Sequence, residues 1–558
     1  MNTTVESTDY YDKQLPYSVR SSSVASTTAV YVRSPVPGGE SHDIFIIDSD
    51  GEWRRLTRIG QSRHPRWRPG RQQLGICSCR PPDPAVTGHP ETADQATETT
   101  DLWLYDLAGG DARQLSTCPN RVEGFDWSPD GSRAVLAVRR PVDEGRSNDD
   151  RLPPARRPRV SRPDDEETAS FERSLVVVNE MGDHQHVEGT WSRSTYGRQW
   201  LHRMKPAWGP NGRIAFVANQ GGSPAGFDVF SVEPDGSNRR NHTDSEHACT
   251  DPEWSPDGDR IAFVQYDQRE LATPHEACVV SSKDDQVRSL SAGLDRCIHY
   301  VDWLDSDTVV GCVLDAGSGV LYALEIDGDC SPLYEPAWPE SVKWSGRHRP
   351  FDVDRAAGRI ETATIHPTAS RVVRLHLDSQ RQAVASRTTR HTLNATIHPE
   401  GEIDTRQLRT ETDDGTTVEG FYCVPPGFDD APAASVPSVV DVHREMDSVD
   451  APRFRFRHQF LLDRGYAVLK LNFRGSRSYG ADFCAAGREK YLDAAVADLT
   501  AGVGASARRT ATGPRERVRL WDVLRRRLRR RATGRDGSPR RRYRQTRDLR
   551  LHERRLRR

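Results

Sequence analysis

The first 300 residues alternate between polar turns and apolar strands in a recurring order. A tryptophan precedes a turn and then an apolar run in FDWSPDGSRAVLAV from Phe125, PAWGPNGRIAFVAN from Pro206 and PEWSPDGDRIAFVQ from Pro252. Proline presets φ at the second turn position, aspartate can bond nearby backbone, and glycine accepts positive φ. Runs such as RIAFV have the β-branched, alternating character of strands. The pattern therefore predicts strand, tight turn and strand.

The repeat spacing indicates a β-propeller. Strand pairs such as DLWLYDLAGGDARQLS, from Asp101, lie between the copies, so one unit holds about four strands. Successive tryptophans at 208, 254 and 303 are 46 and 49 residues apart, a spacing typical of propeller blades. We expect six to eight blades, with an irregular sandwich as the alternative. The candidate blade-turn residues are Trp127, Pro129, Asp130, Gly131, Trp208, Gly212, Trp254, Pro256, Asp257 and Gly258.

Two other stretches between repeats differ in composition. Residues 80–101 and 141–170 are rich in proline and charge, so we expect surface loops there.

The pattern changes after about residue 400. Strands such as SVVDVH and YAVLKLNF then alternate with the helical segments HQFLLDRG and EKYLDAAVADLTAGV, which indicates the opening of an α/β sheet.

We therefore expect a chain of four parts. Residues 1–35 form an N-terminal extension, and residues 36–400 form the all-β propeller. Residues 405–503 form an incomplete α/β-hydrolase domain, and residues 504–558 form an arginine-rich tail.

The segment LKLNFRGSRSYGADF carries a resemblance to a known family. It resembles the Asn-x-Arg-Gly-Ser-x-x-Tyr-Gly stretch of prolyl oligopeptidase and acylaminoacyl-peptidase relatives, and the blades resemble those of this family and of TolB. The matching positions are Asn472, Arg474, Gly475, Ser476, Tyr479 and Gly480. The resemblance implies a propeller that restricts access to a serine peptidase. It also implies hydrolysis of short peptides through an acyl-enzyme, without metal or organic cofactor.

The sequence departs from the family at two places. The family has His-Gly-Gly-Pro near the oxyanion region, whereas this chain has HREM from His443, so we expect a degenerate oxyanion region there. The family nucleophile lies in Gly-x-Ser-x-Gly, followed by aspartate and histidine. Residues 504–558 contain no such motif. We therefore expect the chain as written to lack the catalytic triad and to be inactive.

The arginine block is consistent with a shifted reading frame. Codons permitted for LWDVLRRRLR, from Leu520, read in another frame as Tyr-Gly-Thr-Ser-Tyr-Gly-Gly-Gly-Tyr, which resembles the missing elbow. The tail holds 22 arginines, 5 acidic residues and no lysine, a charge of +17. The net charge of −2 therefore leaves −19 for residues 1–503. An acidic body with six lysines in the whole chain suggests solubility at high salt.

Alternatives from other classes remain. The propeller could be a non-catalytic binding module, and the tail could bind nucleic acid, although few aromatic residues interleave with its arginines, which argues against nucleic acid as a partner. We expect no signal peptide or membrane span and a cytoplasmic location. The ten cysteines are scattered, which favours free thiols in a reducing compartment over a metal site.

Overall fold

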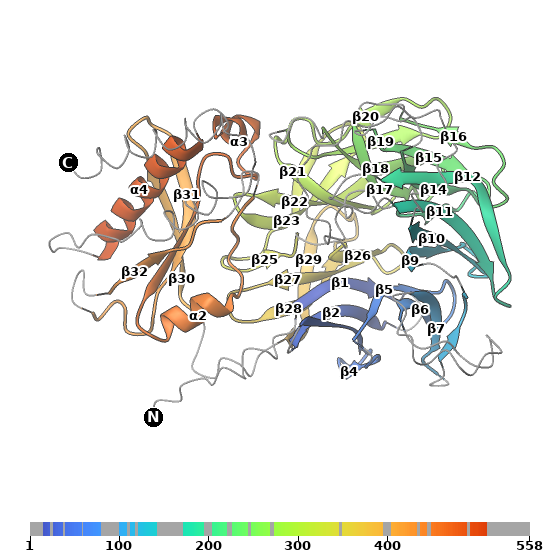
Figure 1. Ribbon diagram of the computed structural model, residues 1–558, viewed down its shortest axis with the longest axis horizontal. Coiled ribbons are helices and arrows are strands. Elements are labelled where there is room, and N and C mark those ends of the chain that lie inside the picture. The colour runs from blue at the N-terminus through green and yellow to red at the C-terminus, as the bar shows by residue number, and fades with distance from the viewer. Residues whose placement is uncertain are drawn as a thin grey trace.

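The structure is a computed structural model with a ring of small sheets beside a mixed sheet (Figure 1). It describes residues 15–510 apart from 23–25, 37–38, 59, 80–99, 109–111, 118–120, 142–170, 195–203, 220–225, 244–246, 268–272, 345–348, 394–402, 432–435, 444–447 and 488–490. Most of both expected loop insertions, and the tail from residue 511, lie outside the described residues.

Seven antiparallel sheets, each from one contiguous stretch of chain, make up the described propeller. The first three contain β1 (Leu15–Ser21), β2 (Thr28–Val36), β3 (Gly39–Ile47) and β4 (Trp53–Arg55); β5 (Ser62–Trp67), β6 (Gln73–Ser78), β7 (Asp101–Asp106) and β8 (Ala112–Gln114); and β9 (Arg121–Trp127), β10 (Arg133–Pro141), β11 (Phe171–Asn179) and β12 (His184–Ser194). The next two contain β13 (Ala207–Trp208), β14 (Ile214–Ala218), β15 (Asp228–Val232) and β16 (Arg240–Asn241); and β17 (Ala248–Trp254), β18 (Arg260–Tyr266), β19 (Glu276–Ser281) and β20 (Val287–Ser289).

The last two blades complete the ring. They contain β21 (Cys297–Trp303), β22 (Thr308–Asp315), β23 (Ser318–Glu325) and β24 (Cys330–Tyr334); and β25 (Ser341–Val342), β26 (Phe351–Asp354), β27 (Arg359–Ile365), β28 (Ser370–Leu377) and β29 (Val384–Leu393). The first and last blades share a core in which Val19 and Val30 meet Ala363 and Val372. Packing between these blades therefore joins the two ends of the ring. We expected residues 1–35 to precede the propeller, but β1 and all of β2 except Val36 lie there and belong to the first blade, because β2 pairs along its length with β3.

The repeated turn has the geometry that its sequence predicts. The Gly131 amide donates to the Ser128 carbonyl at 2.8 Å, so Pro129 and Asp130 are the central turn residues. Asp130 Oδ1 accepts hydrogen bonds from the Ser128 hydroxyl and the Ser132 amide, and these bonds lower the pKa of Asp130 to about 2. Gly131 has φ 71°. The copy at Ser255, Pro256, Asp257 and Gly258 has the same Gly amide bond, at 2.9 Å, with Gly258 at φ 76°.

The repeated tryptophans connect neighbouring blades. Trp67 Nε1 donates to the Arg20 carbonyl at 2.9 Å and Trp127 Nε1 donates to the Arg66 carbonyl at 3.3 Å. Trp303 Nε1 donates to the Glu253 carbonyl at 2.9 Å. In each case the acceptor lies on the first strand of the preceding blade. The variant copy differs, because Trp208 Nε1 donates within its own turn to the Gly212 carbonyl at 3.1 Å.

The remaining sheet is the start of the α/β domain. It contains β30 (Thr405–Glu411), β31 (Thr417–Cys423), β32 (Ser438–Val440) and β33 (Ala467–Asn472), in the order β30-β31-β33-β32. The strands β32 and β33 are parallel and the other pairs are antiparallel. The helices are α2 (Phe456–Leu462), α3 (Ala481–Ala486) and α4 (Tyr491–Thr510).

The sheet has helices on both faces. Tyr422 and Leu469 pack with Ala495 and Leu499 of α4, whereas Phe421 and Cys423, which alternate with them, pack with Leu462 of α2. None of the helices in the described part of the chain is long and apolar enough to cross a bilayer. The fold class expected from the sequence, a propeller followed by an incomplete α/β-hydrolase domain, is confirmed.

Candidate active site

The carboxyl ends of β32 and β33 bring the expected site residues together. Because these strands are parallel, His443, three residues after β32, meets the segment that follows Asn472 at the end of β33. Ligands of open α/β sheets bind at this edge. Residues 444–447 of the family's oxyanion region lie outside the described residues, so the expected degenerate oxyanion region stays a prediction.

His443 and Ser476 form a buried pair. His443 Nε2 lies 2.9 Å from Ser476 Oγ, and that hydroxyl donates to the Phe473 carbonyl at 2.6 Å. The imidazole stacks on the Phe473 ring with centroids 4.3 Å apart. Ser476 is 0% exposed. Its hydroxyl proton is bound to backbone and a substrate cannot reach it, so Ser476 shapes the loop and is not a nucleophile.

Arg474 connects the loop after β33 to α4 through hydrogen bonds. Its Nη2 and Nε donate to Asp498 Oδ1 at 2.7 and 3.0 Å, and its amide donates to Asp498 Oδ2 at 2.7 Å. Asp498 is fully buried. Nη1 donates to Asp414 Oδ2 at 2.5 Å, in the turn between β30 and β31. One side chain thus ties the site edge to the sheet and to its covering helix.

Asn472 fixes the opposite side of the loop. Its Oδ1 accepts the Asp450 amide at 2.7 Å, while Nδ2 donates to the Asp450 carbonyl and the Tyr479 hydroxyl, both at 3.0 Å. Burial raises the pKa of Tyr479 well above its usual value, so the phenol stays protonated. Asn472 and Tyr479 both line a cavity of about 220 Å³ that also touches Gly317 of the propeller.

The two family glycines allow turns that other residues would strain. Gly475 has φ 98° and Gly480 has φ 94°. A Cβ on Gly480 would lie 2.3 Å from Asp295 Oδ2, and the Ala481 amide donates to Asp295 Oδ1 at 2.9 Å. The motif therefore ends in direct contact with the sixth blade.

Sequence reasoning missed the inter-domain contacts of this loop. Arg477 Nη1 lies 2.8 Å from His275 Nε2, and the Ser478 carbonyl and hydroxyl accept the Ala316 and Gly317 amides, both at 3.0 Å. Arg477 and Ser478 occupy the variable positions of the motif. No periodicity links them to partners more than 160 residues away.

The sequence also did not predict a buried charge cluster near the carboxyl ends of β32 and β33. Lys470 Nζ lies 2.9 Å from Asp441 Oδ2 and 2.8 Å from Asp450 Oδ2, and His458 Nε2 lies 2.8 Å from Asp441 Oδ2. Lys470 is 1% exposed. Burial lowers the pKa of Lys470, although both carboxylates act in the opposite direction. The available signal was a lysine inside an apolar strand of a chain that has six lysines.

Comparisons with known proteins agree with this geometry. Residues 452–521 match the sequence model described as prolyl oligopeptidase family. The uncharacterized peptidase YuxL of Bacillus subtilis (strain 168) is 23% identical over 514 residues, which cover 83% of this chain and 70% of that protein. Residues 452–521 are thus similar to the prolyl oligopeptidase family, and the chain over most of its length is similar to a peptidase. The match runs beyond residue 503, where we expected the hydrolase segment to end, and α4 likewise continues to Thr510.

Two solved structures share this fold. The acylaminoacyl peptidase of Pyrococcus horikoshii superposes with a TM-score of 0.67 at 16% identity, covering 91% of this chain and 73% of that one. A puromycin hydrolase has a TM-score of 0.61 at 16% identity, covering 92% and 74%. The chain thus shares the fold of these two proteins.

Proposed function

We propose that this protein derives from a peptidase that hydrolyses short peptides through an acyl-enzyme, with the propeller restricting access to the site. The observation that carries the proposal is the loop from Asn472 to Gly480. It lies at the carboxyl edge of the sheet and is bonded to the fifth and sixth blades. A substrate at this edge would lie between the sheet and the ring, where bulk water and large polypeptides have limited access.

We further propose that the chain as printed forms no acyl-enzyme. Ser476 is buried in its loop, and residues 504–558 hold no Gly-x-Ser-x-Gly. A change of reading frame from about Gly504 onward would account for the arginine block in residues 504–558. On this proposal the tail is not a nucleic-acid site.

The test compares the printed chain with a frame-corrected chain. The gene is resequenced across codons 495–530 and the bases beyond codon 558 are read. Both proteins are treated with a fluorophosphonate probe and assayed on peptidyl anilides. We expect labelling and turnover only in the corrected chain, at the serine of Gly-x-Ser-x-Gly. Turnover by the printed chain, or a confirmed frame with no hydrolase remainder downstream, would refute the proposal.

We also propose that the protein works in a reducing compartment, the cytoplasm. The nine cysteines within the described part of the chain form no disulfide with one another, and seven of them are buried. This cysteine usage is typical of proteins whose stability does not depend on disulfides. Mass spectrometry of alkylated protein from its own cells should find every thiol unoxidised, and a native disulfide would contradict the proposal.

A further inference from the structure

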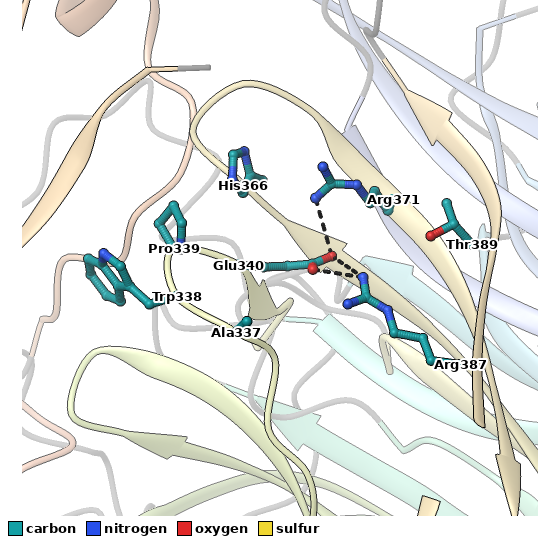
Figure 2. Close-up of a pocket in the computed structure, with 8 residues that line it drawn as sticks. All are labelled: Ala337, Trp338, Pro339, Glu340, His366, Arg371, Arg387 and Thr389. Atoms are coloured by element: carbon teal, nitrogen blue, oxygen red, sulfur yellow. Dashed lines mark hydrogen bonds and ion pairs between the residues drawn. The ribbon is translucent and has the colours of Figure 1, made fainter. Parts of the chain in front are cut away.

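The last blade carries a cavity of about 470 Å³ beside the domain junction. Figure 2 shows Glu340, Arg371 and Arg387 facing one another in it, with His366 and Trp338 on the far side and Thr389 at its edge. Trp338 also lines the 220 Å³ cavity between the propeller and the hydrolase strands, and its Nε1 donates to the Thr405 carbonyl at 2.9 Å. This site, which we name the arginine pocket, is therefore adjacent to the junction but outside the loop from Asn472 to Gly480.

One buried carboxylate holds the two guanidinium groups. Arg387 Nη2 donates to both oxygens of Glu340, at 2.9 and 2.7 Å, and Arg371 Nη1 lies 3.5 Å from Oε1. Glu340 is 6% exposed and also accepts the Thr364 hydroxyl at 2.5 Å. Two cations share one anion, so the cluster has one net positive charge. Such a cluster favours a monovalent anion, because a divalent one would meet Glu340 at short range.

Arg387 is positioned to donate further hydrogen bonds. Its guanidinium carbon lies 5.8 Å from the centroid of the Tyr334 ring, which supports it from another side. Among the described residues it makes hydrogen bonds through Nη2 alone. The side chain is 33% exposed. Its Nε and Nη1 groups are therefore donors of fixed direction at a solvent-accessible site, and each can donate a charge-assisted hydrogen bond to a carboxylate oxygen.

We propose that the arginine pocket binds the C-terminal α-carboxylate of a short peptide. The peptide chain would extend past Trp338 toward the hydrolase strands. The inference rests on the proposed peptidase function for its biological meaning, but the binding itself needs no catalytic serine. It would select peptides with a free C-terminus over amidated or internal segments.

Binding to the printed chain tests the proposal. The probes are N-acetyl-trialanine as the free acid and as the C-terminal amide, with acetate and inorganic phosphate as free anions, followed by calorimetry or ligand-observed NMR. We expect the acid to bind at least about tenfold more tightly than the amide. Arg387→Met should remove that difference, whereas Arg54→Met, at an exposed arginine of the first blade, should preserve it.

Each outcome decides the proposal. Equal binding of acid and amide overturns it. Binding of acetate or phosphate as tightly as the peptide acid also overturns it, because the pocket would then be a general anion site. If Arg387→Met does not fold, Arg387→Lys is used, which keeps the charge and should reduce the acid preference several-fold. Hydrolysis by the frame-corrected chain without any acid preference would refute this inference alone. Acid preference without hydrolysis would refute only the proposed function.

Discussion

The propeller and the hydrolase segment are stabilised in different ways. Each blade is built from one contiguous stretch, and each has a neighbour on both sides, since the first and last blades share a core. The hydrolase sheet instead places β33 between β31 and β32, so its central strand comes last in the sequence. In the described residues β32 pairs on one side only. The ring is therefore closed by contacts between its own first and last blades, whereas the sheet depends on pairing between strands that are far apart in the sequence.

The largest expected effect is a substitution that destabilises the hydrolase segment and leaves the stability of the propeller unchanged. Asp498→Ala leaves Arg474 without its buried partner, and losing one member of such a pair costs about 3–5 kcal/mol. Urea unfolding followed by hydrogen exchange should show earlier opening of β33 and α4 with unchanged blades. Asp414→Ala is the matched control, because this carboxylate binds the same arginine from a side chain that is 55% exposed, and it should cost less than about 1 kcal/mol. Equal losses would contradict the comparison.

The pH dependence of the unfolding free energy tests the interface between the propeller and the hydrolase segment. Burial and then the charge of Arg477 lower the pKa of His299 to about 3, and burial lowers the pKa of His275 well below its usual value. His299 also faces His275 and Trp344, and His275 faces Tyr266 and Arg477.

Because the unfolded histidines bind protons near pH 6.5 and the folded ones do not, stability is lost as the pH falls from about 6.5 toward 3. The burial of His299 should cost about 2 kcal/mol at pH 5. Glu253, whose pKa burial raises to about 6, acts in the opposite direction. The measurement is therefore the difference in unfolding free energy between the parent and His299→Phe at pH 7.5 and pH 5. An unchanged difference would reject the prediction.

A smaller effect tests how the blades are joined. Trp303 donates to the preceding blade at 2.9 Å, whereas Trp254 Nε1 has no hydrogen-bond partner among the described residues. Both side chains are at most 6% exposed. Replacing each by phenylalanine removes similar volume, so Trp303→Phe should cost about 1 kcal/mol more than Trp254→Phe in thermal unfolding. Identical losses would show that packing alone connects the blades.

The smallest effect concerns salt. The body up to residue 503 carries −19, and screening weakens repulsion between like charges. We expect the melting temperature of the propeller to rise by a few degrees, roughly, between 0.1 and 2 M KCl. Loss of structure as the salt concentration rises would reject adaptation to high salt.

Much of the architecture could be predicted because its signals are local. The Pro129-Asp130-Gly131 turn follows from φ preferences within four residues, and the helix preceding Gly465 ends at Leu462 with that glycine at φ 75°. The strand β33 was expected from its apolar run, yet the position of Lys470 between Asp441 and Asp450 was not. Charge pairing between distant segments leaves no periodic pattern in the sequence.

The sequence by itself determined the blade repeat, the order of propeller and hydrolase segment, and the family loop from Asn472 to Gly480. Turn chemistry and side-chain alternation act between neighbouring residues and can be read directly. Only the tertiary structure decided that Ser476 is buried, that Arg477 meets His275, and that Glu340 gathers Arg371 and Arg387 into one pocket. These contacts join residues up to 202 positions apart. They exist only after ring closure and domain docking have fixed the distances between them.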